Sequence, residues 1–265
     1  MREAYGACPL CGGEGRVLST VDCRQHPLWH EPLPPDLTWM RCGRCGHVYT
    51  RHYWTEAGLA EVFARTHAFQ VAGGDPDQKR QVWKSVVANV VALVGGYRSV
   101  LRMDPVPTWL DVGCGDGALV MAAEEFGFRA VGVDARRQTV EILQGLGYRA
   151  VVADFVTGTI DEQPLVISMM DVLEHLPWPV EALERARTLL PPGGVLVVSL
   201  PNADSSSWRI MDKRQANPYW IEIEHHHNFT RGRLTQLLED TGFDVVLYEI
   251  PYRYKAQMEL YALRT

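Results

Sequence analysis

Short apolar runs alternate with helical segments from about residue 108 to the end of the chain. The runs predict strands at 108–112, 129–133, 149–153, 165–170, 195–200, 243–250 and 258–263. Apolar residues at helical spacing predict helices near 117–126, 136–145, 179–190 and 230–241. Strands and helices that alternate in this way build a mainly parallel sheet with helices on both faces. The pattern therefore predicts an α/β domain with a seven-stranded sheet.

The last two predicted strands have no helix between them. Without a crossover they can only pair as a hairpin, so we expect the final strand to run antiparallel in an otherwise parallel sheet. The helix before them has Thr230 as its predicted N-cap and Gly242 as its stop, and Leu234, Leu237 and Leu238 are expected to face the core.

The chain upstream of this pattern divides into two zones. Residues 1–54 show little helical periodicity, and the proline-rich stretch "EPLPPDL" at 31–37 predicts a loop between short strands. Residues 55–107 predict two helices, near 56–67 and 77–94, which are separated by "AGGDPD" and end at Gly95 and Gly96. We therefore expect a small N-terminal module at 1–54, a helical linker or cap at 55–107, and the main domain at 108–265.

Composition is that of a globular protein, with 46% hydrophobic and 22% charged residues. No apolar stretch reaches the roughly 18 residues of a membrane span, and "MREAYGACPLCGG" lacks the apolar core of a secretory signal, so we expect a cytoplasmic protein without a membrane partner. The net charge is −6, and residues 1–54 hold six arginines against five acids. Nucleic-acid binding is disfavoured, because it calls for a clustered basic surface.

Four of the six cysteines form two C-x2-C pairs, namely Cys8 with Cys11 and Cys42 with Cys45. Each pair supplies half of a tetrahedral zinc site, and the glycine after each second cysteine helps the turn. Four thiolates leave no open position, so the metal is expected to be structural. A redox pair or free cysteines are the alternatives, whereas Cys23 and Cys114 are expected to be unligated.

Three glycines at alternate positions follow the first strand of the main domain, in "DVGCGDGAL". Gly113, Gly115 and Gly117 predict the first strand-to-helix turn, which lies beneath the ligand in sheets of this kind. The spacing differs from the G-x-G-x-x-G of dinucleotide enzymes, although nicotinamide and flavin enzymes remain an alternative. Asp111 and Asp116 would repel a diphosphate but attract a sulfonium and an ammonium group. The loop therefore favours S-adenosylmethionine (SAM), which carries both cations and no phosphate.

Acids also end the next two strands. Asp134 ends the second strand, where its carboxylate can accept both ribose hydroxyls. After the third strand, Asp154 can contact an adenine amino group and Phe155 the face of the ring. Asp154 could instead be a mere cap of the strand end, and Asp111 could serve chiefly to hold the loop.

These motifs together resemble the class I SAM-dependent methyltransferases over roughly residues 75–265. "LDVGCGDG", "VGVD", "MMDVLEHLPWP" and "LLPPGGVLVVSLPN" are similar to that family's successive motifs. Pro164-Leu165 departs from the Phe-Asp that relatives often have before the fourth strand, at an end remote from the ligand. The resemblance implies a Rossmann-like sheet with a reversed last strand. It also implies that Ala135, Met170 and Asp171 contact the cofactor.

A long insertion at 201–229 separates the fifth strand from the last helix and is expected to form a substrate lid or wall. It ends in "IEIEHHH"; if this run is extended, His225 and His227 share one face. Relatives often show H-x-H here, so we expect the catalytic base to be His225, followed by His175, with His227 as a further candidate. Histidines that bond only to backbone, or a second metal site with Glu222 and Glu224, are alternatives.

A zinc module ahead of such a domain resembles two groups, which are bacterial methyltransferases of sugar and natural-product pathways and rRNA methyltransferases that grip RNA with the module. The near-neutral module favours the first. We expect methyl transfer to a small-molecule acceptor, such as a nucleotide-linked sugar or a secondary-metabolite intermediate. An RNA or protein methyltransferase and a non-catalytic SAM sensor are the alternatives. The sequence does not indicate the acceptor atom or the oligomeric state.

Overall fold

A seven-stranded sheet forms the centre of the main domain in the computed structural model, which describes residues 1–63, 76–252 and 256–265. Its strands are β6 (Thr108–Val112), β7 (Arg129–Asp134), β8 (Arg149–Val152), β9 (Val166–Met170), β10 (Val195–Pro201), β12 (Phe243–Glu249) and β13 (Gln257–Arg264). Each lies within about one residue of a predicted strand. The short apolar runs therefore located all seven.

The strands follow the order β12-β13-β10-β9-β6-β7-β8 across the sheet. β10, β9, β6, β7 and β8 are parallel, whereas β13 runs antiparallel to both β10 and β12. The predicted hairpin and reversed last strand are confirmed. β6 has β7 on one side and β9 on the other, so the chain order reverses there, and a crevice opens at the carboxyl ends of these strands.

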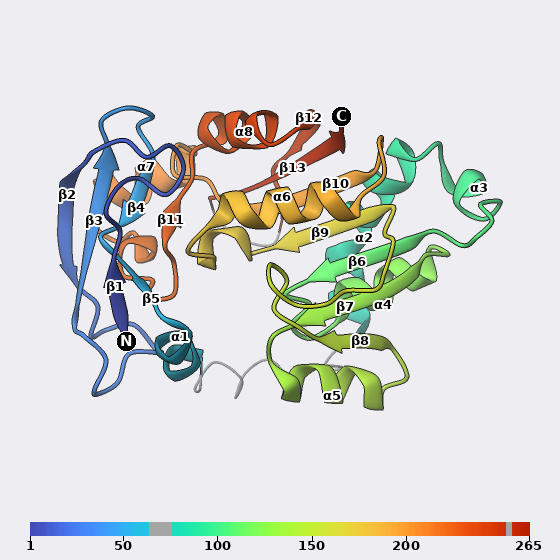
Figure 1. Cartoon of the computed structure of the whole chain (residues 1–265), viewed down its shortest axis with the longest axis horizontal. Helices are drawn as coiled ribbons and strands as arrows, with labels where there is room; N and C mark the ends of the chain where they lie inside the picture. The colour runs from blue at the N-terminus through green and yellow to red at the C-terminus, as the bar shows by residue number, and fades with distance from the viewer. Residues whose placement is uncertain (64–75, 253–255) are drawn as a thin grey trace.

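Helices cover both faces of the sheet, as predicted (Figure 1). α6 (Pro179–Leu189) and α8 (Arg231–Asp240) supply buried residues to the core on one face. α2 (Pro76–Leu93), α4 (Ala118–Glu125) and α5 (Arg137–Gly145) supply the core on the other. α1 (Glu56–Phe63) begins as predicted, but the rest of the predicted helix at 56–67 and most of "AGGDPD" lie outside the described residues.

Side-chain alternation along the strands explains the two cores. On β6, Leu110 and Val112 face the core of α6 and α8, while Trp109 faces the core of α2 and α4. Because both faces are covered, all five residues of β6 are buried. This is why the apolar residues of the strand do not alternate with exposed polar ones, and why its two polar residues, Thr108 and Asp111, are themselves buried.

The helix ends follow the predicted signals. Thr230 is the N-cap of α8, and its hydroxyl accepts a hydrogen bond from the Arg233 amide at 3.2 Å. Gly242 ends the helix with a φ of 85°, and Gly95 and Gly96 follow α2 with φ values of 93°, followed by the short α3 (Tyr97–Val100). Such left-handed angles favour glycine at helix ends.

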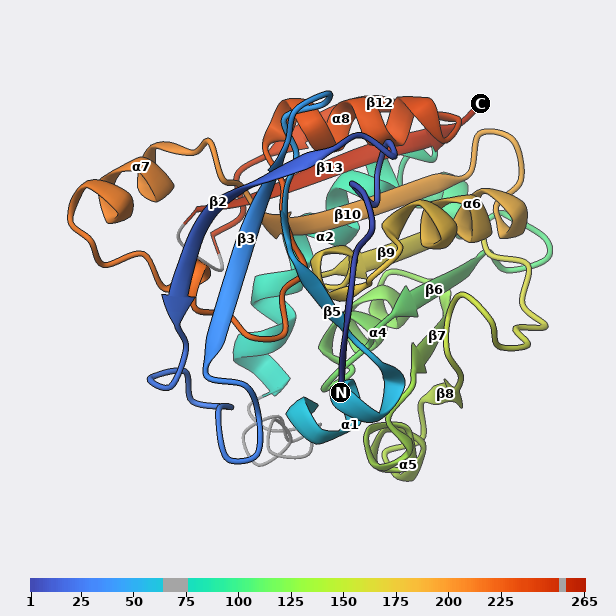
Figure 2. The ribbon, with the colours of Figure 1, turned by 60° about the vertical axis from the view of Figure 1, so that its left-hand side comes forward.

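The N-terminal module contains two small sheets. β1 (Arg2–Ala4) pairs with β5 (His52–Trp54), and β2 (Gly15–Asp22), β3 (Asp36–Cys42) and β4 (Val48–Thr50) form an antiparallel sheet. The fourth strand of that sheet is β11 (His227–Asn228), which comes from the insertion at 201–229. The module and the insertion are therefore joined by strand pairing between β4 and β11, which lie side by side in Figure 1. The turned view brings β2 and β3 of the module in front of the large sheet (Figure 2).

The insertion contains α7 (Ser206–Lys213) and a 3-10 turn, η3 (Pro218–Trp220), before it reaches the module. Trp39 Nε1 of β3 donates to the Trp220 carbonyl at 2.9 Å, and Trp54 Nε1 of β5 donates to the Ile223 carbonyl at 2.6 Å. Ile223 is buried in the module's core. The run "IEIEHHH" is extended only from His227, because Ile223 and Glu224 form a turn.

Candidate functional site

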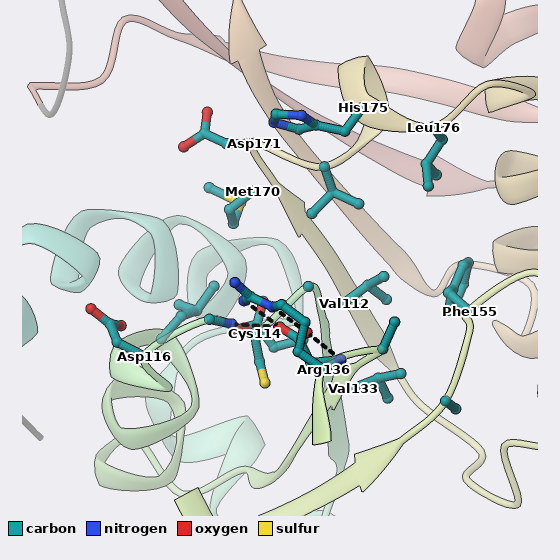
Figure 3. A pocket seen from close by; sticks show the side chains of 18 of the residues that line it. Val112, Cys114, Asp116, Val133, Arg136, Phe155, Met170, Asp171, His175 and Leu176 are labelled. Atoms are coloured by element: carbon teal, nitrogen blue, oxygen red, sulfur yellow. Dashed lines mark hydrogen bonds and ion pairs between the residues drawn. The ribbon is translucent and has the colours of Figure 1, made fainter. Parts of the chain in front are cut away.

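A cavity of about 450 Å³ lies at the carboxyl ends of the parallel strands (Figure 3). We call it the central pocket. Its walls come from the loop after β6, the ends of β7, β8 and β9, Trp83 of α2, and Glu224 of the insertion. Ten of the eleven residues expected at the cofactor line it: Asp111, Gly113, Gly115, Asp116, Asp134, Ala135, Asp154, Phe155, Met170 and Asp171. Gly117 instead precedes the first residue of α4.

The glycine loop needs glycine for both conformation and space. Gly113, Gly115 and Gly117 have φ values of 65°, 51° and 75°, which side chains rarely adopt. A Cβ atom at Gly113 would lie 2.6 Å from Cγ2 of Val172, and one at Gly117 would collide with Leu143. The loop therefore passes tightly beneath the pocket.

Two buried hydrogen bonds in series orient the Asp111 carboxylate. Trp109 Nε1 donates to Ser168 Oγ at 2.8 Å, and Ser168 Oγ donates to Asp111 Oδ1 at 2.6 Å. Asp111 is only 3% exposed. This carboxylate is therefore oriented by neighbouring strands while it contributes to the pocket wall, so the loop-holding role and a ligand role are compatible.

Asp134 ends β7 and is paired with Arg136. Arg136 donates from Nε to Oδ1 and from Nη2 to Oδ2, both at 2.7 Å, and the Gly115 amide donates to Oδ2 at 3.2 Å. The backbone amide of Arg136 donates a second hydrogen bond to Oδ1 at 3.0 Å. The carboxylate thus ties the end of β7 to the glycine loop.

The third strand end presents Asp154 and Phe155. Asp154 Oδ1 accepts hydrogen bonds from the amides of Val156 and Thr157 and from the Thr157 hydroxyl, at 2.8–2.9 Å. This is the strand-end cap that the sequence left open as an alternative. Phe155 is buried and lines the pocket, where an aromatic face can stack on a flat ring.

His175 is the predicted catalytic histidine that lines the central pocket. It ends a 3-10 turn (η2, Leu173–His175) after β9, and its Nδ1 lies 3.1 Å from the Glu224 carbonyl oxygen. A carbonyl can only accept, so Nδ1 carries the proton and Nε2 is the basic nitrogen of the neutral ring. Burial lowers the pKa of His175 to about 4. The ring is therefore neutral near pH 7.

The other two predicted catalytic histidines are not among the described residues that line the pocket. His225 is buried behind His175, with the ring centroids 4.6 Å apart and the planes nearly perpendicular. His227 points to the N-terminal module, where its Nδ1 lies 3.0 Å from His47 Nε2. Of the three histidines only His227 lies in a strand, so the alternation that would have placed His225 and His227 on one face does not hold.

Glu224 reaches the pocket, although the sequence suggested only a metal-binding alternative for it. Burial and the charge of Glu222 raise the pKa of Glu224 to about 7. Trp83, from the second predicted helix, and Arg136 also line the pocket and were not anticipated as site residues. An aromatic residue in a predicted core helix carries no local signal that it faces a ligand.

The four paired cysteines converge on one point. Their Sγ atoms all lie within 4.8 Å of one another, with Cys8 to Cys45 at 3.8 Å and Cys11 to Cys42 at 3.5 Å. Zinc–sulfur bonds of 2.3 Å in a tetrahedron require sulfurs about 3.8 Å apart. Gly12 and Gly46 have φ values of 67° and 73°, as expected for the turns. The donor set and spacing thus fit zinc.

A second group of possible ligands behaves differently. His26 Nε2 lies 2.8 Å from Glu222 Oε2 and 3.5 Å from Glu224 Oε2. However, His26 Nδ1 accepts from the Leu28 amide at 3.3 Å, so Nε2 carries the ring proton and donates it to Glu222. A protonated nitrogen cannot bind a metal. This contact ties the module to the insertion without one.

Among the described residues, no helix is long and apolar enough to cross a membrane.

Several curated proteins that are similar to this chain are methyltransferases. The ubiquinone biosynthesis O-methyltransferase of Stutzerimonas stutzeri is 29% identical over 107 residues, which is 37% of this chain and 46% of that protein. An uncharacterized 37.1 kDa protein in transposon TN4556 of Streptomyces fradiae is 31% identical over 166 residues, 56% of this chain and 48% of that protein. The chain spans about half the length of the curated relatives it matches.

Solved structures share the fold at low sequence identity. A Burkholderia thailandensis 1,6-didemethyltoxoflavin-N1-methyltransferase with its substrate and S-adenosylhomocysteine has a TM-score of 0.56 at 20% identity, covering 78% of this chain and 87% of that one. The SAM-bound magnesium protoporphyrin IX methyltransferase of Synechocystis PCC 6803 has a TM-score of 0.51 at 19% identity, covering 77% and 91%. The methyltransferase-domain family matches residues 95–248, more than half of the chain. The chain therefore belongs to this family, with the fold of the class I SAM-dependent methyltransferases.

Proposed function

We propose that the protein transfers a methyl group from SAM to a hydroxyl group of a small organic molecule. The observation that carries the proposal is the composition of the central pocket, which brings a glycine loop flanked by carboxylates and the basic nitrogen of His175 into one cavity. SAM supplies an electrophilic methyl group on a positively charged sulfur, so the protein has to bind it, orient the acceptor and take up a proton.

The cofactor side of the pocket suits a cationic nucleoside. Asp111 and Asp116 attract the sulfonium and the ammonium group, and the amides of the glycine loop can approach a ligand closely. Asp134 is placed to accept the ribose hydroxyls if it shares its oxygens with Arg136. Ala135, Phe155, Met170 and Asp171 complete the walls that would surround the adenosine.

His175 is the proposed general base. Its Nδ1–H bond to the Glu224 carbonyl fixes the ring so that Nε2 can accept the acceptor's proton. His225, buried against His175, is proposed to support that ring, while His227 acts elsewhere. Orientation of the hydroxyl by this wall can lower the barrier by roughly 7–11 kcal/mol, more than the proton transfer alone.

A small acceptor is favoured over RNA. Residues 1–54 hold six arginines against five acids, so they lack the excess of positive charge that binding to a polyanion such as RNA requires. The relatives named ubiquinone biosynthesis O-methyltransferases favour oxygen as the acceptor atom.

Zinc is the proposed structural metal of the N-terminal module. Cys8, Cys11, Cys42 and Cys45 would hold it with four thiolates and leave no position for a substrate. Its role would be to fix the two turns against β3 and β4.

Two measurements test the proposal. Titration calorimetry should show binding of S-adenosylhomocysteine and none of NAD or FAD. Mass spectrometry after incubation with SAM and a panel of phenols, catechols, sugar nucleotides and structured RNA should show a gain of one methyl group on a small hydroxylated compound. Binding without transfer to any panel member would favour a SAM sensor, and methylation of RNA alone would overturn the choice of acceptor.

A further inference from the structure

The loop that carries His175 is held from outside by the N-terminal module. This loop, residues 171–178, follows β9 and contributes Asp171, His175 and Leu176 to the central pocket. Tyr5 Oη of the module donates to the Pro177 carbonyl at 2.9 Å, and the ring of Tyr5 packs edge-on against Trp178 with the centroids 5.2 Å apart. The wall of the pocket therefore has its outer support in a different part of the chain.

Two buried histidines form the most direct link in this support. His227 Nε2 lies 2.9 Å from the Leu176 carbonyl oxygen, and His227 Nδ1 lies 3.0 Å from His47 Nε2. The carbonyl can only accept, so His227 carries its proton on Nε2 and its Nδ1 is an acceptor. His47 must then donate from Nε2. The two hydrogen bonds therefore run the same way: His47 donates to His227, and His227 donates to the Leu176 carbonyl.

The two rings are rigidly placed. His47 and His227 are 2% and 1% exposed, and both pack against Phe229, with ring centroids 4.8 and 5.6 Å from it. Next to His227, both backbone groups of His226 are paired: its amide donates to the Glu174 carbonyl at 2.8 Å, and its carbonyl accepts from the Thr50 amide at 2.9 Å. A shift of β4 would therefore be passed to Glu174 and Leu176, the residues on either side of His175.

His47 lies in the turn that presents two of the four thiolates. The Cys42 amide donates to the His47 carbonyl at 2.9 Å, and the Gly46 amide donates to the Cys42 carbonyl at 3.1 Å. The amides of Arg44 and Cys45 point at Cys42 Sγ, at 3.4 and 3.5 Å. Any change in the Cys42–Cys45 turn moves the backbone of His47 with it.

We propose that His47 and His227 are positioning residues for methyl transfer, and that the cysteine cluster, when it holds zinc, sets their geometry. They fix the Leu176 carbonyl and so place the adjacent His175 against the acceptor. The inference rests on the proposed function, since it assigns His175 to the acceptor side. Misplacement of a reacting group by about 1 Å can cost on the order of a hundredfold in rate, so a fixed support is chemically significant.

The variant His227→Ala removes both bonds, whereas His227→Gln keeps a donor toward Leu176. For His227→Ala we expect kcat to fall at least tenfold. Zinc content should be unchanged, and affinity for S-adenosylhomocysteine should fall much less than kcat, because most of the residues on the cofactor side lie outside residues 171–178. His227→Gln should recover most of kcat. The double variant His47→Ala/His227→Ala should be no slower than His227→Ala, because the two residues act through one path.

Trp39→Phe is the matched control. It removes the buried hydrogen bond from Trp39 to the Trp220 carbonyl, which joins the module to the insertion without touching residues 171–178. We expect it to lower stability while leaving kcat near the wild-type value. Equal losses of kcat in His227→Ala and Trp39→Phe, or no recovery in His227→Gln, would reduce the histidine pair to a structural contact and overturn the inference.

A readout without turnover separates this inference from the proposed function. Long-range ¹H–¹⁵N spectra of the imidazole rings should show His47 and His227 both protonated at Nε2. Removal of zinc with a chelator should shift their signals and those of His175. A proton on Nδ1 of His227, or His175 signals that ignore the chelator, would refute the positioning path. If these spectra agree but no acceptor is ever methylated, the proposed function alone fails.

Discussion

The guanidinium of Arg136 donates a hydrogen bond of 2.7 Å to each carboxylate oxygen of Asp134, two residues earlier. Asp134 is only 5% exposed, so burial and this pairing keep its carboxylate in a fixed orientation at the end of β7. A ribose that used the same oxygens would have to share them with Arg136. The Arg136 guanidinium therefore holds the Asp134 carboxylate in place and also competes with a ribose for its oxygens.

This relationship predicts opposite effects for two substitutions. Asp134→Asn should weaken binding of S-adenosylhomocysteine at least tenfold, since each hydrogen bond to a charged acceptor contributes about 1.5–3 kcal/mol. Arg136→Gln should tighten binding of S-adenosylhomocysteine modestly and of SAM more, because it removes a competitor and a positive charge near the sulfonium. Titration calorimetry measures both. Unchanged affinity in Asp134→Asn would exclude this carboxylate as the ribose acceptor.

Ser168 is predicted to matter for stability more than its size suggests. Its hydroxyl is buried between Trp109 and Asp111 and bonds to both. Ser168→Ala would leave the Trp109 N–H without this partner and free Asp111 to reorient, which should lower the free energy of unfolding by about 1–3 kcal/mol. Urea denaturation gives the value. Ser168→Cys, a weaker donor of similar size, should show a smaller loss, and an alanine variant as stable as wild type would contradict this pair of hydrogen bonds.

Much of this fold could be predicted because its signals are local. Buried parallel strands read as short apolar runs, and all seven were located from the sequence. The pocket residues could be predicted for a related reason, since the carboxyl ends of adjacent parallel strands meet at one edge of the sheet. Once β6, β7 and β8 were placed, Asp111, Asp134 and Phe155 had to be neighbours.

The placement of the histidines could not be obtained in this way. β11 is two residues long and pairs with β4, about 180 positions earlier, so no local pattern announces it. That pairing, together with the turn at Glu224, separates His227 from the pocket and leaves His225 behind His175. Strand pairing at such separation depends on tertiary packing rather than on sequence periodicity.

The cysteine cluster makes a direct prediction for metal content. The purified protein should contain one zinc per chain by elemental mass spectrometry. Cys42→Ser should lose it and destabilise the module, because a single missing thiolate opens the tetrahedron. Cys23→Ser is the control: Cys23 is equally buried, but its Sγ contacts the Pro35 carbonyl at 3.1 Å, a bond that a serine hydroxyl can retain. Full zinc content in Cys42→Ser would rule out a four-thiolate site.

His175 and His225 make distinguishable kinetic predictions. His175→Gln should lower kcat by roughly a hundredfold to ten-thousandfold, the usual contribution of a general base, while leaving S-adenosylhomocysteine affinity intact. His225→Gln should have a smaller effect, because the ring lies behind His175. Since burial lowers the pKa of His175 to about 4, the wild-type rate should stay level from pH 7 down to about 5 as far as this group is concerned. A larger loss of kcat in His225→Gln than in His175→Gln would indicate that His225, and not His175, is the general base.

Buried neutral histidines should make the protein sensitive to acid. Burial lowers the pKa of His47, His175, His225, His226 and His227, to about 4 for His175 and His227. An unfolded histidine has a pKa of about 6.5, so between that value and about 4 the unfolded chain binds protons that the folded chain does not. Stability conferred by these groups is complete above pH 6.5 and is lost as the pH falls. Glu224 has the opposite effect on the pH dependence of stability, because its pKa is raised to about 7 in the folded state. Between about pH 4.5 and 7 the folded chain binds a proton at Glu224 that the unfolded chain has released, which offsets one histidine.

For these five histidines and Glu224 the net difference is up to four protons, and each changes the free energy of unfolding by about 1.4 kcal/mol per pH unit. Urea denaturation at pH 7.5, 6.5 and 5.5 should therefore show a loss that steepens below pH 6.5. His226→Leu, which removes one of the five histidines with a lowered pKa, should reduce the slope by about one proton. A free energy of unfolding that stays constant from pH 7.5 to 5.5 would mean that these rings are solvated enough to titrate normally, and would contradict their burial between the module and the central pocket.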